Sequence, residues 1–315
     1  MSNSQMNTAQ ARVIDPILSN HARGYTNAEH VGHTLFPNVP IPQRGIRRLE
    51  FGKEAFRAQN TRRAPGGATK RIQFGYEGKP VALEQHSLEG KVAWEHMEDA
   101  SRVPGIDLAT GAVNLVLDVM ALGREIQQAG AARNPANYDA NHKLVLAGAD
   151  KWSDGASKPV QDVNDAKEAI RSTAGRYPNT MVIGPKVFLD LKVHPAVIEQ
   201  FKYTGKDSIT VDMLARYFDV ERLEVGKAVF LPENAGDDDA FTDVWGNDVV
   251  LAWVPTAGAN WQTPSYGYTY HLAGHPFVEK PYDERNAKSW FYPVTDEHSV
   301  ELVGADAGFL IQGAH

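Results

Sequence analysis

The chain has 315 residues, 42% hydrophobic and 23% charged, which is enough to bury the core of one large domain or two ordinary ones. It contains no cysteine, which excludes disulfides, thiolate nucleophiles and cysteine-ligated metal centres. No apolar run approaches the roughly 18 residues that a membrane span requires, and the polar start MSNSQMNTAQ lacks the pattern of a secretory signal. Export and membrane insertion are therefore not expected.

Charge is distributed unevenly along the chain. Residues 1–75 carry 11 Lys and Arg against 4 Asp and Glu, whereas the whole chain has a net charge of −7. The basic N-terminal quarter fits either a nucleic-acid-binding arm or a segment that lies over the acidic body of a neighbouring subunit. Its arginines follow a strand-like region without helix-face clustering or a nucleic-acid-binding motif, which favours the contact between subunits.

An extended arm and a hairpin are predicted first. Residues 1–44 show little periodicity and contain four prolines, which is typical of an arm. Residues 45–80 predict a long β-hairpin with the polar tip NTRRAPGGAT. An isolated two-stranded ribbon is marginally stable in water, so this one should rest on a neighbour. Arg62 and Arg63 at the tip are expected to contact carboxylates there.

A long amphipathic helix is predicted next, at about 108–132, which corresponds to roughly 37 Å. Apolar residues recur there at three- and four-residue spacing, and Asp107 can cap the first turn. Gly111 and Gly123 each cost about 1 kcal/mol of helix propensity relative to alanine. They indicate either the close approach of another backbone or tolerated substitutions.

The second half predicts an α/β module and then a strand-rich end. The module combines a strand at 144–146, a helix at 161–174, a strand at 181–183, helices opening at 185, 195 and 210, and a strand within 220–230. From residue 263 the chain reads as strands separated by turns, in the segments SYGYTYHLAG, HPFVEKPYDE, KSWFYPVTD and HSVELVGADAGFLIQ.

Motifs for chemistry are absent from the sequence. There is no GxxxxGK[ST], GxGxxG after a strand, HExxH or GxSxG, so neither an enzyme nor a cofactor is predicted. His30 and His33 are two lone imidazoles, fewer ligands than a metal site needs. Asp237, Asp238 and Asp239 form the densest carboxylate group. They favour a solvated loop, with a cation site as the alternative, although the calcium-loop pattern is missing.

Two further groups of residues have a simpler structural interpretation. His96 with Glu95 and Asp99 could suggest an acid–base set, but adjacent side chains point in different directions and favour a polar rim. Six aromatic residues near the start of the strand-rich end favour core or interface packing over a ligand groove. These aromatic residues are Trp245, Trp253, Trp261, Tyr266, Tyr268 and Tyr270.

Several phrases resemble tailed-bacteriophage major capsid proteins with the Hong Kong 97-like capsid fold. The phrases are HTLFPNVPIP after the arm, PNTMVIG and LKVHP in the module, and VWGNDVVLAW and PSYGYTYHLAG downstream. The resemblance covers most of the chain and implies an α+β fold. Its implied parts are an N-terminal arm (1–44), an extended β-hairpin loop (45–80), a peripheral domain with a long spine helix (81–145), an axial α/β domain (146–262), and peripheral-domain C-terminal strands (263–315).

The resemblance also implies a function. The subunit would assemble as hexamers and pentamers into an icosahedral phage head around double-stranded DNA, contacted without sequence specificity. Assembly would take place in the host cytoplasm with scaffold, portal and decoration proteins as partners. Arg62, Arg63, Asp237, Asp238 and Asp239 are the expected assembly contacts. An encapsulin-like nanocompartment shell protein, which shares the fold, is the alternative.

Overall fold

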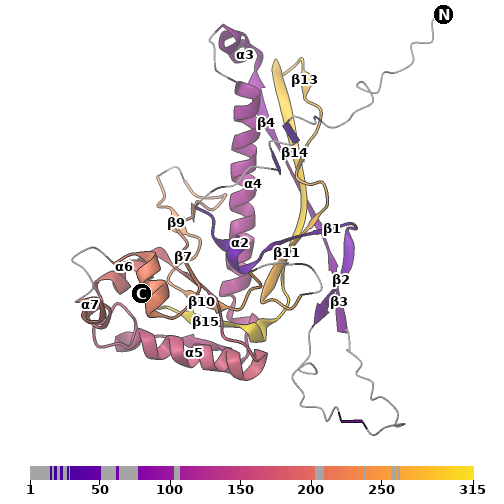
Figure 1. The fold of residues 1–315 in the computed structure, drawn as a ribbon. Coiled ribbons are helices and arrows are strands. Elements are labelled where there is room, and N and C mark those ends of the chain that lie inside the picture. The colour runs from indigo at the N-terminus through magenta and orange to yellow at the C-terminus, as the bar shows by residue number, and fades with distance from the viewer. Residues whose placement is uncertain are drawn as a thin grey trace, which may run out of the picture.

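A 26-residue helix joins two β-sheets in this chain (Figure 1). The computed structural model describes residues 15, 18–19, 22–23, 27, 29–50, 62–63, 77–102, 107–202, 209–236, 238–256, 260 and 263–315, with the backbone alone at 48–50 and 77. Within these residues the fold is α+β, as predicted. No helix in the described ranges is long and apolar enough to cross a membrane.

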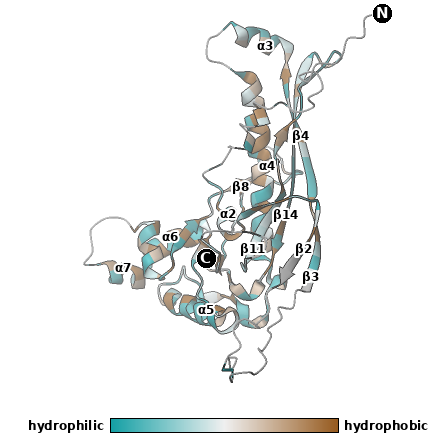
Figure 2. Cartoon of the chain, turned by 45° about the vertical axis from the view of Figure 1, so that its right-hand side comes forward, coloured by the Kyte–Doolittle hydropathy of each residue, from teal (hydrophilic) through white to brown (hydrophobic). Residues whose placement is uncertain are grey.

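The long helix α4 (Leu108–Arg133) confirms the predicted helix and its cap. The Asp107 carboxylate accepts hydrogen bonds from the backbone N–H groups of Ala109 and Thr110 at 3.1 and 3.2 Å, which satisfies donors that the first helical turn leaves free. Figure 2 shows hydrophobic and hydrophilic residues alternating along this helix. The buried side includes Val113, Val116 and Leu117, which pack against a sheet.

That sheet has six strands and is organised around β14 (Ser289–Leu302). β4 (Glu84–Ala93) pairs with β14 antiparallel over ten residues, from Ser289↔Ala93 to His298↔Glu84. The other strands are β1 (Asn38–Ile41), β11 (Gly267–Leu272), β12 (Phe277–Val278) and β13 (Tyr282–Glu284). The turn predicted between KSWFYPVTD and HSVELVG is wrong, because β14 runs through both segments and remains buried through most of its middle.

The backbones of α4 and β4 approach each other closely at Gly90, a glycine of the strand. A Cβ added at Gly90 of β4 would lie 2.8 Å from the carbonyl oxygen of Ala112 on α4. By contrast, a Cβ at Gly111 or Gly123 would meet nothing within 4 Å. The predicted close approach at those two helical glycines is therefore not made by the described residues of the subunit.

The second sheet has five strands in the order β5-β15-β10-β6-β7. They are β5 (Lys143–Val145), β6 (Thr180–Ile183), β7 (Arg222–Val225), β10 (Val249–Ala252) and β15 (Gly308–Gln312). Four helices share a hydrophobic core with this sheet: α5 (Pro159–Ala174), α6 (Pro185–Val193), α7 (Pro195–Phe201) and α8 (Val211–Tyr217). The predicted strands and helices of the α/β module are thus confirmed, within a few residues at each end.

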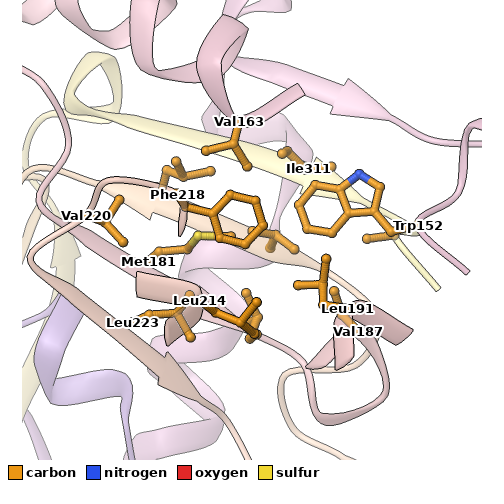
Figure 3. Close-up of a cluster of buried hydrophobic side chains, with 14 of the residues drawn as sticks. Trp152, Val163, Met181, Val187, Leu191, Leu214, Phe218, Val220, Leu223 and Ile311 are labelled. Atoms are coloured by element: carbon orange, nitrogen blue, oxygen red, sulfur yellow. The ribbon is translucent and has the colours of Figure 1, made fainter. Parts of the chain in front are cut away.

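Aromatic side chains pack in the core between the five-stranded sheet and its helices, a unit that we call the five-stranded-sheet body. Trp152 and Phe218 are buried with their ring centroids 6.1 Å apart, among aliphatic side chains from the sheet and helices (Figure 3). The indole N–H of Trp152 donates to the Asp162 carboxylate at 2.8 Å, so the one polar atom of that ring keeps a partner. Burial raises the pKa of Asp162, while this hydrogen bond opposes the rise.

The chain end departs from the prediction. Residues 263–315 were expected to supply the C-terminal strands of the peripheral domain, but β15 lies in the five-stranded sheet, antiparallel to β10 and parallel to β5. That part of the prediction is wrong. The physical reason is that β15 is apolar on both faces. Phe309 and Ile311 are buried in the core that packs against the helices of the five-stranded sheet, and Leu310 is buried in the core shared with α4. The last strand thereby ties the two sheets together.

The hairpin root and the end of the predicted arm complete the fold. β2 (Gly45–Glu50) pairs antiparallel with β3 (Glu77–Ala82), as predicted for the first residues of each limb; residues 51–61 and 64–76 lie outside the described residues. α2 (Gly32–Leu35) and β1 are packed into the core rather than extended from it, with Leu35 and Phe36 fully buried. A further hairpin joins β8 (Val229–Phe230) to β9 (Thr242–Asp243).

The remaining described elements are short. An unpredicted helix, α3 (Trp94–Ser101), follows β4 and buries no residue. Four 3₁₀ turns are η2 (Pro135–Asn137), η3 (Ala140–His142), η4 (Gly148–Asp150) and η5 (Ala305–Ala307).

Candidate assembly surfaces and the junction between the sheets

Glu125 lies at the junction where α4, next to the six-stranded sheet, meets the five-stranded-sheet body. This α4 residue is 1% exposed, and its carboxylate accepts hydrogen bonds from the backbone N–H groups of Val31 and Gly32 at 2.9–3.0 Å. It also accepts from the indole N–H of Trp245 at 2.7 Å. A buried carboxylate is tolerated only when such donors surround it. One side chain therefore fixes α2, α4 and the segment before β10 relative to one another.

The last turn of α4 makes a second connection. Arg133 donates to the Asp248 carboxylate at 2.7 Å and to the Val244 carbonyl oxygen at 2.7 Å. The same carboxylate accepts from the backbone N–H of Gly313, after β15, at 3.0 Å. Positive charge is favourable at a helix C-terminus. The helix end is thus bonded to two segments of the five-stranded-sheet body.

Two buried tyrosines strengthen the same junction. The hydroxyl groups of Tyr138 and Tyr266 are hydrogen-bonded to each other, and Tyr138 also donates to the Ala132 carbonyl oxygen at 2.6 Å. Burial raises the pKa of both tyrosines well above the ordinary value. Both phenols therefore stay neutral and remain hydrogen-bond donors. Together with Glu125 and Arg133, they make α4 a rigid connection between the sheets.

The opposite side of α4 is an exposed ridge. It consists of residues at intervals of three or four along the helix, so they share one face. We call this set the spine ridge; its members are Gly111, Leu115, Val119, Gly123, Gln127 and Gly130. Leu115 is 66% and Val119 51% exposed, and Leu88 of the adjacent β4 is 41% exposed. These three apolar side chains are therefore exposed in the part of the chain that the structure describes.

The predicted contact residues lie at two separate places. Arg62 and Arg63 are exposed, beyond the β2–β3 root. Asp238 and Asp239 are exposed in the loop between β8 and β9, where the Asp239 carboxylate accepts from the Gly236 backbone N–H at 2.8 Å; Asp237 lies outside the described residues. Figure 1 shows the β2–β3 root and β9 well apart, so one subunit does not bring its described basic and acidic hairpin ends together.

The other candidate metal-binding or acid–base residues from the sequence are exposed or half-buried. His33 is exposed and His30 half-buried, and burial lowers the pKa of His30. Glu95, His96 and Asp99 are exposed on α3. Across the described ranges, no group of three or more His, Asp or Glu residues has the geometry of a metal site. The described residues thus do not bring these side chains together into a metal site.

Four of the six aromatic residues belong to the core, as predicted. Tyr266, Tyr268 and Tyr270 are fully buried and Trp245 is 1% exposed. Trp253 instead stacks under the Arg176 guanidinium, whose carbon lies 4.3 Å from the ring centroid. Trp261 lies outside the described residues.

The sequence reasoning missed Glu125 and a cluster of histidines. A charged residue on the buried side of a predicted amphipathic helix is the signal that could have identified Glu125, because burial of a carboxylate requires dedicated donors. The histidines come from strands far apart in the sequence and carry no common motif.

Comparisons with known proteins agree with this architecture. Residues 137–292 match the family described as "Phage major capsid protein E". The major capsid protein of Burkholderia phage BcepMu is 38% identical over 310 residues, covering 97% of this chain and 98% of the relative. A phage-related protein of Bordetella bronchiseptica RB50, solved by crystallography, is 48% identical with a TM-score of 0.84, covering 97% of this chain and 99% of its own.

More distant structures share the fold alone. The bacteriophage PhiM1 mature capsid has a TM-score of 0.52 at 12% identity, covering 91% of this chain and 88% of the other. The fold is thus shared with phage capsid subunits. The chain belongs to the family of phage major capsid proteins. That family is a structural class rather than an enzyme class, and the named relatives favour the phage function over the encapsulin-like alternative.

Proposed function

We propose that this major capsid protein assembles as hexamers and pentamers into an icosahedral phage head that encloses double-stranded DNA, with the Hong Kong 97-like division of the subunit. Residues 1–44 supply an N-terminal arm, of which 31–41 are packed in the core, and 45–80 an extended loop. Residues 81–145 and 263–302 form the peripheral domain, and 146–262 with β15 the axial domain. The subunit resides in the virion and assembles in the host cytoplasm.

The observation that carries the proposal is the spine ridge. Exposed apolar patches of this kind mark contact surfaces, and glycines at three ridge positions let a neighbouring backbone come closer than any side chain would permit. The ridge is continuous with exposed Leu88, so a strand or ribbon from another copy can lie along α4 and β4. Scaffold, portal and decoration proteins are further proposed partners, and DNA is contacted without sequence specificity.

The hairpin tip supplies the electrostatic part of assembly in this proposal. Reversing both charges in an Arg62→Glu, Arg63→Glu variant should leave the circular dichroism spectrum unchanged, because both residues are exposed. Shell yield should fall, because the tip would now repel the acidic body of its neighbour. Parent assembly should likewise weaken at high salt, where exposed charges are screened. Sedimentation of assembly mixtures measures both effects.

A matched control reverses two exposed lysines of the five-stranded-sheet body, Lys158→Glu and Lys202→Glu. That variant makes the same change of net charge without touching the tip, so it should assemble better than the tip variant. Normal shells with parental yield and salt response from the tip variant would contradict the electrostatic role of Arg62 and Arg63.

The acidic β8–β9 loop is proposed to lie near a capsomer axis. Five or six copies would then bring like charges together. Replacing Asp237, Asp238 and Asp239 by Asn should raise the particle's disruption midpoint at low ionic strength, and the gain should vanish at high salt. Asn preserves the local hydrogen bond from Gly236, so the loop itself should keep its shape.

The control for this experiment removes exposed charge elsewhere, by Asp283→Asn with Glu284→Gln on β13. Its disruption midpoint should match that of the parent. Equal midpoints for the acidic-loop variant and the parent at every salt concentration would place the loop away from any symmetry axis.

A further inference from the structure

Four histidines gather where the six-stranded sheet faces α4 and at its edge. His86 lies on β4, His271 on β11, His298 on β14, and His275 in the turn after β11. Strand register brings them together, because His271 is directly opposite His298 and His86 is opposite Asp296. The His86 and His298 rings are stacked with centroids 4.4 Å apart. We call these four residues the histidine cluster.

Charged groups surround the cluster on every packed element. From β14, Asp296 accepts a hydrogen bond from Nδ1 of His298 at 3.0 Å, and from α4, Gln127 lies 3.2 Å from Nε2 of that ring. Arg124 of α4 lies 3.8 Å from the Asp296 carboxylate. Glu84 on β4 also acts electrostatically on His86.

The other face of the sheet carries the remaining partners. Glu297 accepts two hydrogen bonds from Arg44, at 2.6 and 2.9 Å, and lies 3.8 Å from Nε2 of His275. β1 places Pro40 opposite His271 and adds no charge there.

The cluster leaves buried polar atoms without hydrogen bonds. These atoms are Nε2 of His86, both ring nitrogens of His275, and Oδ1 of Asp296. A pocket of about 390 Å³ opens beside two members of the cluster, with His86, His298, Arg124 and Gln127 among its lining residues. Solvent protons therefore have a route to His86 and His298 from the side of the spine ridge, where Val119, Gly123 and Gln127 also line the pocket.

We propose that the histidine cluster is a proton-sensitive joint between α4 and the six-stranded sheet. At neutral pH, uncharged His86 and His271 allow the sheet to pack against α4. When they take up protons, new positive charges lie beside each other and beside Arg124. Repulsion and desolvation then weaken the packing of β4 and β14 on α4. The joint makes the stability of the shell subunit depend on pH, which is a property beyond its role in assembly.

The direction of the pH dependence follows from linkage. Burial lowers the pKa of His86 and His271 below 6.5; His298 acts in the same direction on both, whereas the Asp296 carboxylate opposes the shift without cancelling it. The unfolded chain then binds more protons than the folded one just below pH 6.5, so the free energy of unfolding falls as the pH drops through that value. It levels off only below the folded-state pKa values.

The carboxylates titrate in a different window. Burial alone would raise the pKa of Asp296, but the hydrogen bond from His298 and the nearby positive charges bring it below its usual value. The hydrogen bond from Arg44 lowers the pKa of Glu297. Their stabilising contributions are lost only under more acidic conditions, below about pH 4. The range from about pH 7.5 to 5.5 therefore reports on histidines.

The test compares melting temperatures of the full-length chain between pH 7.5 and 5.5. The parent should lose stability on acidification, and a His86→Gln, His271→Gln variant should lose most of that dependence. His96→Gln removes an exposed histidine and should behave as the parent. His30→Gln is a second control, because burial lowers the pKa of His30 too; its effect should add to that of the double variant. A parental pH slope in the double variant would overturn the proposal.

If the double variant fails to fold, hydrogen exchange of the parent protein tests the proposal instead. After correction for intrinsic rates, the amides of β4 and β14 should exchange several-fold faster at pH 5.5 than at pH 7.5. Those of β6, in the other sheet, should not. Unchanged protection in β4 and β14, or an equal loss in β6, would overturn the proposal.

Discussion

Val116→Asp should abolish folding of the subunit. Val116 is 3% exposed and packs with Val278, Tyr292 and Val294 between α4 and the six-stranded sheet. An unpaired carboxylate there costs several kcal/mol, against a total stability of roughly 5–15 kcal/mol for a typical domain. Thermal unfolding followed by circular dichroism should show no cooperative transition, or one far below that of the parent.

The neighbouring residue provides the matched control. Leu115 belongs to the spine ridge and is 66% exposed, so Leu115→Asp should fold with nearly the parental melting temperature and fail at assembly. The pair separates folding from assembly by a one-residue shift on one helix. A Val116→Asp protein with an unchanged melting transition would show that this face of α4 is not buried.

Glu125→Ala is expected to have the next largest effect on stability. The substitution leaves the N–H groups of Val31, Gly32 and Trp245 without their acceptor. Each buried unsatisfied donor costs about 1–3 kcal/mol, so the total should be several kcal/mol. Urea denaturation should show a lower midpoint with a similar slope.

Glu125→Gln distinguishes loss of the acceptor from loss of volume. The amide keeps one oxygen acceptor and the side-chain shape, so this variant should lie between Glu125→Ala and the parent. An Ala variant within about 1 kcal/mol of the parent would contradict the role assigned to Glu125 at the junction.

Local signals explain what could be predicted from the sequence. The Asp107 cap and apolar spacing defined α4, and Pro185, Pro195 and Thr210 marked the starts of α6, α7 and α8. Each is a feature of a few consecutive residues. The helix α3 was missed because it is short and mostly polar: Trp94, Met97 and Ala100 lie at three-residue spacing but are only half-buried.

Long-range register explains what could not be predicted. The apolar run of β15 indicates a buried strand, but it does not specify the sheet of β10 over that of β14. The histidine cluster likewise depends on His86 and His271 both lying along β14 in a particular register. Gly90 was overlooked because its requirement comes from α4, not from its own strand.

Electron microscopy of the purified full-length protein tests the central claim most directly. The subunit presents an uncovered apolar ridge and belongs to the phage major capsid protein family, so negative-stain images should show rings of five or six copies and closed shells. A compact monomer of this length would have a radius of gyration of roughly 20 Å and show no higher order. A uniform population of such monomers, under conditions in which the chain is folded, would contradict the account.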